Sequence, residues 1–140
     1  MRIMGIDYGD ARVGISMSDP LEITAQGFKT LPNKVYSKML DALFGIIDEY
    51  SVKKIVLGMP KNMNGDAGDR VEITKAFSED IKKAYPDIEI VNWDERLTTV
   101  QAAGILNVTN TRGKDRKNVI DTVAACIILQ SYLDYLKGEK

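Results

Sequence analysis

The chain begins with MRIMGIDYGDARVGISMS, residues 1–18, and this stretch indicates how the fold begins. Residues 3–6 form an apolar run typical of a strand buried on both faces, and Asp7 ends it. Turn-forming residues follow at 8–11, and residues 12–18 then alternate apolar and small side chains. The pattern predicts a β-hairpin with a carboxylate at its mouth.

Asp7 has two interpretations at this stage. A carboxylate that follows a buried strand is costly to desolvate unless a cation meets it, so a metal ion is a natural partner. Aspartate is also a common turn former, and Asp7 could serve only to cap the turn. The hairpin by itself leaves both interpretations open.

Length and composition indicate a single globular domain over residues 1–140. The chain is 44% hydrophobic and 28% charged, and its formal net charge is -1, so nucleic acid could be attracted only by a local basic patch. No apolar stretch reaches membrane-spanning length, and the N-terminal segment carries acids instead of a long apolar core. We therefore expect a cytoplasmic protein without a membrane partner.

Histidine is absent and there is a single cysteine, Cys126, inside an apolar run. These two facts exclude histidine-based triads, a disulfide framework and the usual zinc sites. Any acid, base or metal chemistry must therefore be carried by carboxylates.

The remaining sequence alternates strand and helix patterns. A third strand is predicted at 23–31, which would complete an antiparallel meander, and two more strands at 53–59 and 88–93. Helices are predicted at 34–50, at 69–85, from Thr98 or Thr99 through residue 105, and at 119–136. The second of these has an apolar stripe made by Ile73, Phe77, Ile81 and Ala84.

The predicted fold class is therefore α/β. We expect a mixed five-stranded sheet, in which strands 1–3 form the meander and strands 4 and 5 are parallel, with helices packed on the sheet.

Topology brings acidic residues together. Strands one, four and five should end at the same edge of the sheet, which places Asp7 beside Asp94 and Glu95. Asp121 joins them if the final helix packs across the sheet with its amino end toward that edge. An acid in the first turn of a helix also stabilises the helix N-terminus, which alone could explain Asp121.

A carboxylate cluster without histidine predicts a metal site. Clustered carboxylates repel one another unless divalent cations neutralise them, and hard oxygen ligands select Mg²⁺ or Mn²⁺. Two such cations can activate water and hold the leaving oxygen in phosphodiester cleavage. This is nuclease chemistry.

The segment 107–118 lacks apolar periodicity and is interpreted as a mobile basic loop. It is either a solvated surface loop or a source of phosphate contacts. Its basic residues are Arg112, Lys114, Arg116 and Lys117. Weaker nucleic-acid-binding candidates, each next to a proposed active-edge motif, are Arg12, Lys61, Asn62 and Arg96.

Three motifs together resemble the YqgF family. They are GIDYG at 5–9, VLGMP at 56–60 followed by NMNG at 62–65, and DERLTT at 94–99. The final helix, with Asp121 ahead of an apolar run, is also similar to that family's last helix. The match spans nearly the whole chain.

The resemblance implies an RNase H-like fold and a cytoplasmic, metal-dependent nuclease that takes part in maturing the 5′ end of precursor 16S ribosomal RNA. It assigns the catalytic and metal-binding acids to Asp7, Glu95 and Asp121. Related resolvases usually carry an acid where this chain has Gly58, and a fourth acid expected three residues after Asp121 is replaced by Ala124. Asp94 is a further candidate ligand that could compensate.

Three alternatives stay open. The chain could be a Holliday junction resolvase acting on branched DNA, or a non-catalytic RNA-binding factor in ribosome assembly. It could also be a nucleotide-binding phosphotransferase of the actin-like ATPase type, although those proteins close two such domains around a nucleotide and 140 residues supply one. The protein could also form a weak homodimer, whichever of these functions it has.

Overall fold

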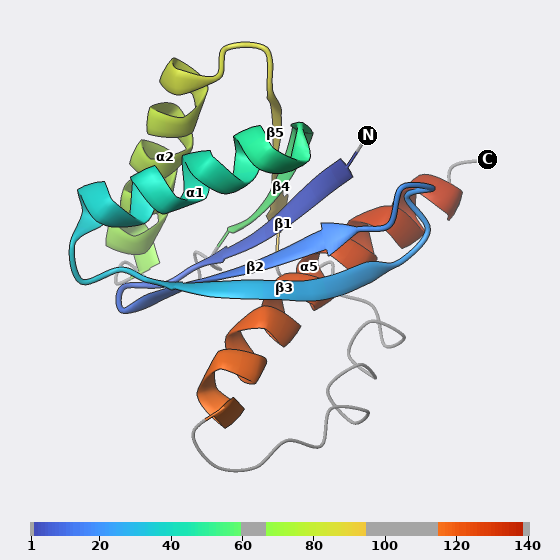
Figure 1. Cartoon of the computed structure of the whole chain (residues 1–140), viewed down its shortest axis with the longest axis horizontal. Helices are drawn as coiled ribbons and strands as arrows, with labels where there is room; N and C mark the ends of the chain where they lie inside the picture. Colours follow the sequence, from blue (N-terminus) through green and yellow to red (C-terminus); the bar gives the residue numbers. More distant parts are fainter. Residues whose placement is uncertain (1, 60–66, 95–114, 139–140) are drawn as a thin grey trace.

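The computed structural model describes residues 2–59, 67–94 and 115–138; of residues 67–69, 94 and 115–121 it describes the backbone. Its centre is a five-stranded sheet in the order β3-β2-β1-β4-β5 (Figure 1). The strands are β1 (Arg2–Tyr8), β2 (Arg12–Ser18), β3 (Ala25–Pro32), β4 (Val52–Met59) and β5 (Glu89–Asp94).

The strand directions are those of a mixed sheet. β2 pairs antiparallel with both β1 and β3, whereas β4 pairs parallel with β1 and with β5. This arrangement confirms the predicted fold class, a meander followed by two parallel strands. Because β1, β4 and β5 run in one direction, they end together at one edge of the sheet, called here the carboxyl edge.

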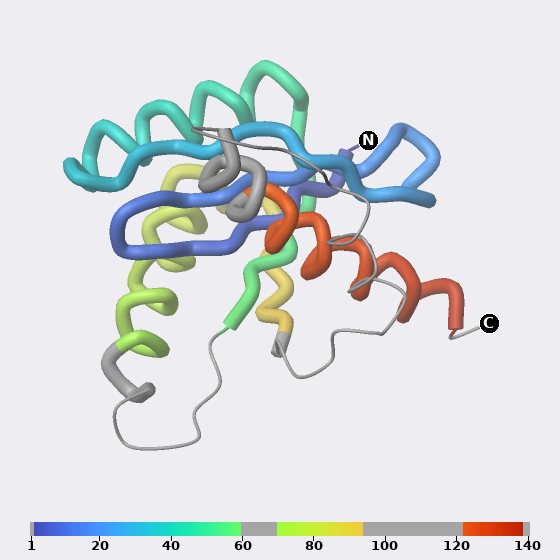
Figure 2. Tube along the Cα trace, turned by 90° about the horizontal axis from the view of Figure 1, so that it is seen from below, coloured from blue at the N-terminus to red at the C-terminus, as the bar shows by residue number. Residues whose placement is uncertain are grey.

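Helices cover both faces of the sheet (Figures 1 and 2). α1 (Tyr36–Tyr50) and α2 (Ala67–Ala84) pack on one face, in a core that includes Ile6, Leu43 and Phe77. α5 (Asp115–Gly138) crosses the other face and packs on Ile3 and Val56. Within the described ranges, no helix combines the length and the apolar content needed to cross a membrane.

Strand alternation assigns each residue of β1 to one of these faces. Met4 and Ile6 belong to the core under α1 and α2, whereas Ile3 belongs to the core under α5. Gly5 also faces α5, because a Cβ atom built on Gly5 would lie 2.7 Å from Leu129 Cβ. The odd-numbered residues of β1 therefore face α5.

Gly5 allows α5 to approach the sheet closely. A side chain there would also meet the carbonyl oxygen of Ala125 at 2.9 Å and the Ser16 hydroxyl, so any larger residue would push the helix away. The Ser16 hydroxyl donates a hydrogen bond of 2.8 Å to that same carbonyl of Ala125. The close approach and this bond together fix α5 against β1 and β2.

Two predictions about the last helix were wrong. α5 begins at Asp115 instead of residue 119, so the end of the predicted basic loop is helical. Asp121 is consequently in the second turn of α5, where stabilisation of the helix N-terminus has largely faded. Apolar periodicity missed this first turn because residues 115–118 are all polar. The predicted helix through residue 105 lies outside the described residues.

The predicted stripe of α2 was also partly wrong. Phe77 and Ile81 are buried as expected, but Ile73 is 46% exposed, and Ala84 is exposed too. Thr74 is buried in their place at 2% exposure. Its hydroxyl donates to the carbonyl of Arg70 at 2.8 Å, so the polar group is satisfied inside the helix and can be buried.

The third strand begins at Ala25, two residues later than predicted. The Asp19 carboxylate accepts hydrogen bonds from the backbone amides of Leu21, Ile23 and Thr24, which ties these residues into a turn. These bonds also lower the pKa of Asp19, chiefly through the amide of Thr24. The apolar Ile23 had favoured a strand, but the local turn bonds override that preference.

Candidate active site

Asp7 lies near the end of β1, on the face that α5 covers. It is half-buried and pairs with Gly14 of β2. Since Ile3 and Gly5 face α5, alternation directs Asp7 to the same face. The hairpin expected from the sequence is present, and it presents this carboxylate at the carboxyl edge.

Asn33 holds the hairpin turn that follows Asp7. Its side-chain Nδ2 donates to the carbonyl of Gly9 at 2.9 Å, and its backbone amide donates to the carbonyl of Ala11 at 2.8 Å. The turn itself is closed by a 3.0 Å bond from the amide of Gly9 to the carbonyl of Arg12. The connection between β3 and α1 therefore clamps the turn from one side.

Arg70 holds the same turn from α2. One guanidinium nitrogen donates to the carbonyl of Tyr8 at 3.2 Å, and the other lies 2.8 Å from the Asp10 carboxylate. The Tyr8 ring stacks on Phe77 of α2, with ring centroids 4.3 Å apart. Sequence reasoning did not find Arg70 or Asn33, because these contacts join residues 62 and 24 positions apart and leave no local pattern.

β5 brings Asp94 to the same edge as Asp7. Asp94 is the last residue of β5 and pairs with Met59 of β4, which lies between β5 and β1. The preceding residue, Trp93, faces α5, where its ring meets the ring of Tyr132 edge-on at 5.4 Å. The next residue, Glu95, lies outside the described residues.

The direction of α5 brings Asp121 toward Asp7. The amide of Ala25 donates to the side chain of Gln130 at 2.9 Å, whereas Gly27 lies against Thr122, so α5 runs opposite to β3. β3 is parallel to β1, so α5 also runs opposite to β1. Two residues of strand and four residues of helix each advance about 6 Å. Moving two residues forward along β1 from Gly5 leads to Asp7. Moving one turn back along α5 from Ala125 leads to Asp121. Figure 1 shows the same relation, because α5 ends on the side where β1 begins.

β4 contributes no acid at the position where related resolvases carry one. Gly58 pairs with Trp93, and a Cβ atom built on Gly58 would meet the end of the Ile128 side chain of α5. Ala124, where a fourth acid was expected, is half-buried in α5. Within the described part of the chain, the acids considered for a site on this face therefore lie on β1, at the end of β5 and on α5.

Carboxylates are the anionic ligands that this chain offers to a metal ion at such a site, because it has no histidine and its one cysteine is buried. Burial raises the pKa of the Cys126 thiol to about 11, so it stays protonated near neutral pH. Among the side chains that the structure describes, no group of three acidic or cysteine residues is close enough to hold a metal ion. The side chains of Asp94, Glu95 and Asp121 are not among those described.

Only some of the residues predicted to contact nucleic acid are among those that the structure describes. Arg12 begins β2, is half-buried and pairs with Pro32 of β3. Arg116 and Lys117 belong to the first turn of α5. The others lie outside the described residues, and they are Lys61, Asn62, Arg96, Arg112 and Lys114.

A pocket of about 350 Å³ lies at the opposite edge of the sheet, where Val52 begins β4 and Ile88 precedes β5. Tyr85 lines this pocket; its hydroxyl donates to the Asp48 carboxylate at 2.8 Å and lies 3.1 Å from the carbonyl oxygen of Phe44. Burial and the bond to Asp48 raise the pKa of Tyr85 to about 12, so it stays protonated near neutral pH. This pocket is separate from the acids of the carboxyl edge.

The overall fold has a counterpart among solved structures. The structure resembles that of a chain titled "T. thermophilus RuvC in complex with Holliday junction substrate", with a TM-score of 0.66, 9% sequence identity, and coverage of 99% of this chain and 96% of that one. At this identity the likeness shows the fold alone. It confirms the predicted RNase H-like architecture.

The sequence supplies the family. Residues 1–135 match the family described as "RuvX: Holliday junction resolvase", and the chain belongs to this nuclease family. A relative from Halothermothrix orenii, named "Putative pre-16S rRNA nuclease", is 48% identical over 135 residues, 96% of each chain. One of the same name from Ruminiclostridium cellulolyticum is 45% identical over 141 residues, 100% of this chain and 99% of its own. The family resemblance predicted from the motifs is confirmed.

Proposed function

We propose that this chain is a metal-dependent endonuclease whose active site lies at the carboxyl edge, with Asp7, Glu95 and Asp121 as its catalytic and metal-binding residues. The observation that carries the proposal is the direction of α5. This direction supports an approach of the first turns of α5, with Asp121, to the edge where β1 ends at Asp7, in a chain that has no histidine.

The residues of this edge fit Mg²⁺ or Mn²⁺. Carboxylate oxygens are hard ligands, and several acids that converge on one face are stable as anions only when a cation balances their charge. Bound there, divalent ions would supply a nucleophilic hydroxide from water and would stabilise charge on the leaving oxygen. Asp7, held by the clamped turn, would orient the ions against the scissile phosphate.

The alternation of β5 favours Glu95 over Asp94 as the third acid. Trp93 faces α5, and residues two apart in a strand share a face, so Glu95 continues that face when the strand direction is extended. We assign Asp94 a supporting role, either as a further metal ligand or through Arg96. The family resemblance assigns the acidic role to Glu95 as well.

The proposed substrate is precursor 16S ribosomal RNA, cut near its 5′ end in the cytoplasm. Relatives 45–48% identical carry that substrate in their names, whereas the structural neighbour in complex with a Holliday junction substrate shares 9% identity with this chain. The proposed phosphate contacts are Arg112, Lys114, Arg116 and Lys117, of which two open the helix that carries Asp121. Arg12, Lys61, Asn62 and Arg96 are weaker candidates.

A cleavage assay tests this function. The wild-type protein is incubated with a 5′-extended 16S precursor fragment or with a four-way DNA junction, in Mg²⁺, in Mn²⁺ and in chelator. We expect the RNA to be cut in either metal, cleavage to stop in chelator, and activity to return when Mg²⁺ is restored.

Each other outcome has a distinct meaning. Cleavage that continues undiminished in chelator would contradict the metal site. Cutting of the junction alone would make the protein a resolvase of branched DNA. Binding of the RNA without any cutting would indicate a non-catalytic assembly factor.

A further inference from the structure

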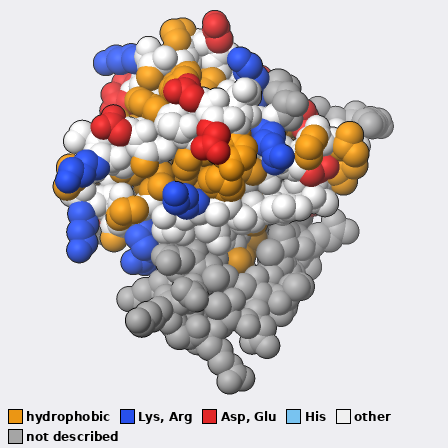
Figure 3. All heavy atoms as spheres, in the orientation of Figure 1, with side chains coloured by type: hydrophobic (Ala, Val, Ile, Leu, Met, Phe, Trp, Pro, Cys, Tyr) orange, Lys and Arg blue, Asp and Glu red, His pale blue; other side chains and the backbone are white. Residues whose placement is uncertain are grey.

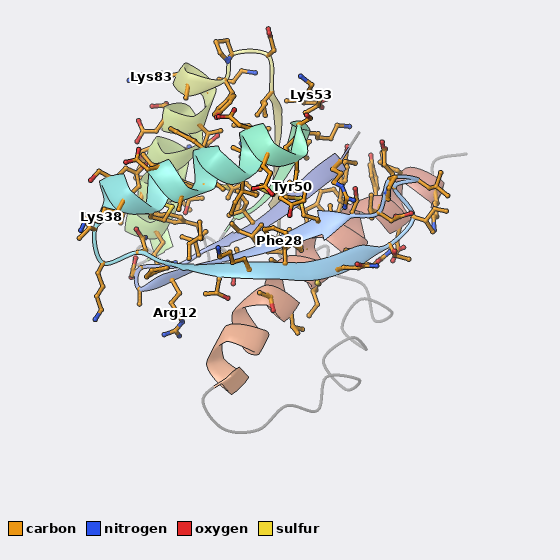
Figure 4. All side chains as sticks on the ribbon, viewed as in Figure 1. Arg12, Phe28, Lys38, Tyr50, Lys53 and Lys83 are labelled. Carbon is orange, nitrogen blue, oxygen red and sulfur yellow. The ribbon has the colours of Figure 1, made fainter. Side chains whose placement is uncertain are left out.

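Two aromatic side chains are exposed in the part of the chain that the structure describes. Tyr36 is the first residue of α1 and is 37% exposed, whereas Tyr135 lies in the last turn of α5 and is 51% exposed. The other described aromatic rings are buried or half-buried. Figure 4 shows two of them, Phe28 of β3 and Tyr50 of α1, whose ring centroids lie 5.1 Å apart. Tyr135 is the more exposed of the two open rings.

The two exposed tyrosines belong to opposite faces of the sheet. The Tyr36 hydroxyl donates to the Asp80 carboxylate at 2.6 Å, which links α1 to α2. In the view of Figure 3, which includes α1, acidic and basic side chains are interspersed among the described residues, a pattern that does not favour a polyanion. Tyr135 belongs to α5, which covers the face on which Asp7 lies. Tyr135 is therefore the exposed ring on the side of the proposed active site.

Tyr135 packs against Trp93, close to the end of β5. The two ring centroids lie 5.5 Å apart at an interplanar angle of 64°. Trp93 is itself 6% exposed, and its indole nitrogen donates to the Ser131 hydroxyl at 3.3 Å. The buried indole supports one part of the Tyr135 side chain, while about half of that side chain stays exposed to solvent.

Strand pairing places Trp93 near Asp7. Ile6 pairs with Leu57, and Gly58, the next residue of β4, pairs with Trp93. The backbone of Asp7, the residue after Ile6, therefore lies about two strand spacings, roughly 10 Å, from that of Trp93. Both residues belong to the face that α5 covers. The pair formed by Trp93 and Tyr135 thus lies beside the proposed site, on its own face of the sheet.

Tyr135 also shares one side of α5 with Asp121. Residues 121, 124, 128, 131 and 135 lie within roughly 80° of one another around the helix. Ile128 contacts the Cβ position of Gly58, and Ser131 accepts the bond from Trp93, so this side of the helix is turned toward β4 and β5. One side of α5 therefore carries Asp121 near its start and Tyr135 near its end.

We propose that Tyr135 is a stacking platform for an unpaired base of the RNA substrate, a few nucleotides away from the phosphate that is cut at the proposed site. Every nucleotide base has a π-face, and exposed aromatic side chains bind single-stranded RNA by stacking on it. Contact with the buried Trp93 restrains the tyrosine ring before RNA binds, which reduces the entropy lost on binding. The inference rests on the proposed function, because it takes RNA as the ligand and Asp7 as part of the cleavage site.

RNA binding by variants of Tyr135 tests the platform. The wild type, Tyr135→Leu and Tyr135→Phe are titrated with a fluorescent, single-stranded 5′-extended 16S precursor fragment without divalent metal. Loss of one stacked base should weaken binding by Tyr135→Leu about tenfold. The dependence of affinity on salt should stay unchanged, because no phosphate contact is lost. Tyr135→Phe keeps the ring and should bind like the wild type, whereas equal affinity of Tyr135→Leu and the wild type would overturn the proposal.

Tyr36→Leu is the matched control, since it removes the other exposed tyrosine from the opposite face. It should bind RNA like the wild type. Equal weakening in Tyr36→Leu and Tyr135→Leu would show a general effect of losing a surface tyrosine, and this result would also overturn the proposal.

An abasic nucleotide, moved along the RNA one position at a time, identifies the stacked base. Binding to the wild type should weaken at a particular position, and binding to Tyr135→Leu should not change there. Trp93 is the only tryptophan of the chain, so its emission should respond less to the abasic RNA than to the intact RNA. Identical abasic profiles for the two proteins would contradict stacking on Tyr135.

Because these measurements use no metal, they do not depend on cleavage. A wild type that shows the position-dependent loss but never cuts RNA would overturn the nuclease proposal alone.

Discussion

Replacing Asp7 by Asn is expected to lower cleavage by roughly 10³-fold or more while leaving the fold intact. Asn keeps the shape of Asp but removes the negative charge that would bind a divalent ion. Asp7 lies on the α5 face of β1, and in the proposed site the loss of its charge would also relieve repulsion with Asp121. The melting temperature without metal should therefore stay the same or rise.

Asp10→Asn is the matched control for this variant. Asp10 lies in the same hairpin turn, and its carboxylate is 75% exposed and paired with Arg70. An exposed ion pair contributes less than about 1 kcal/mol to stability, so this variant should keep both its activity and its melting temperature. If Asp7→Asn instead cut RNA normally, or melted far below the wild type, Asp7 would be a turn cap and not a catalytic acid.

Glu95→Gln is expected to reduce turnover by several orders of magnitude with little change in RNA affinity, whereas Asp94→Asn should have a modest effect on metal affinity or stability. The physical reason is the alternation of β5. Val91 and Trp93 pack toward α5, and Ile90 packs toward α1 and α2. The proposal for Glu95 takes this alternation to continue by one residue beyond Asp94.

Turnover and binding of the two variants are measured in parallel, since a loss of turnover at constant affinity marks a group that acts in the transition state. If Asp94→Asn were the inactive variant and Glu95→Gln kept normal turnover, the assignment at the end of β5 would be wrong by one residue. A slip of one residue exchanges the two faces of a strand, so the result would also place a break in alternation after Trp93.

The sheet could be predicted from sequence because its signals are local. Alternation in residues 12–18 and the apolar run before Asp7 specify the hairpin, and alternating strands and helices specify parallel pairing afterwards. The start of α5 could not be found in this way, because its first turn is polar and buries no apolar stripe. The buried face of α2 was predicted wrongly at Thr74, which is buried although it is polar. Its hydroxyl is hydrogen-bonded within the helix, so the side chain can pack in the core.

The site could be predicted in part. The choice of acids stays a prediction, based on a chain without histidine, whereas topology correctly predicted that β1 and β5 end at the same edge. The direction of α5 does not follow from any local pattern. It depends on the close contact of Gly5 with Ala125, and the clamp on the hairpin turn depends equally on distant residues, Asn33 and Arg70.

The most direct test of the central claim is the binding of Mn²⁺, followed through the electron paramagnetic resonance signal of the free ion. The wild type and the variants Asp7→Asn, Glu95→Gln and Asp121→Asn are titrated under the same conditions. If these acids form one metal site, the wild type should bind Mn²⁺ in competition with Mg²⁺, and each variant should bind it at least about tenfold more weakly. Titration curves that coincide for all four proteins would contradict a carboxylate metal site at this edge.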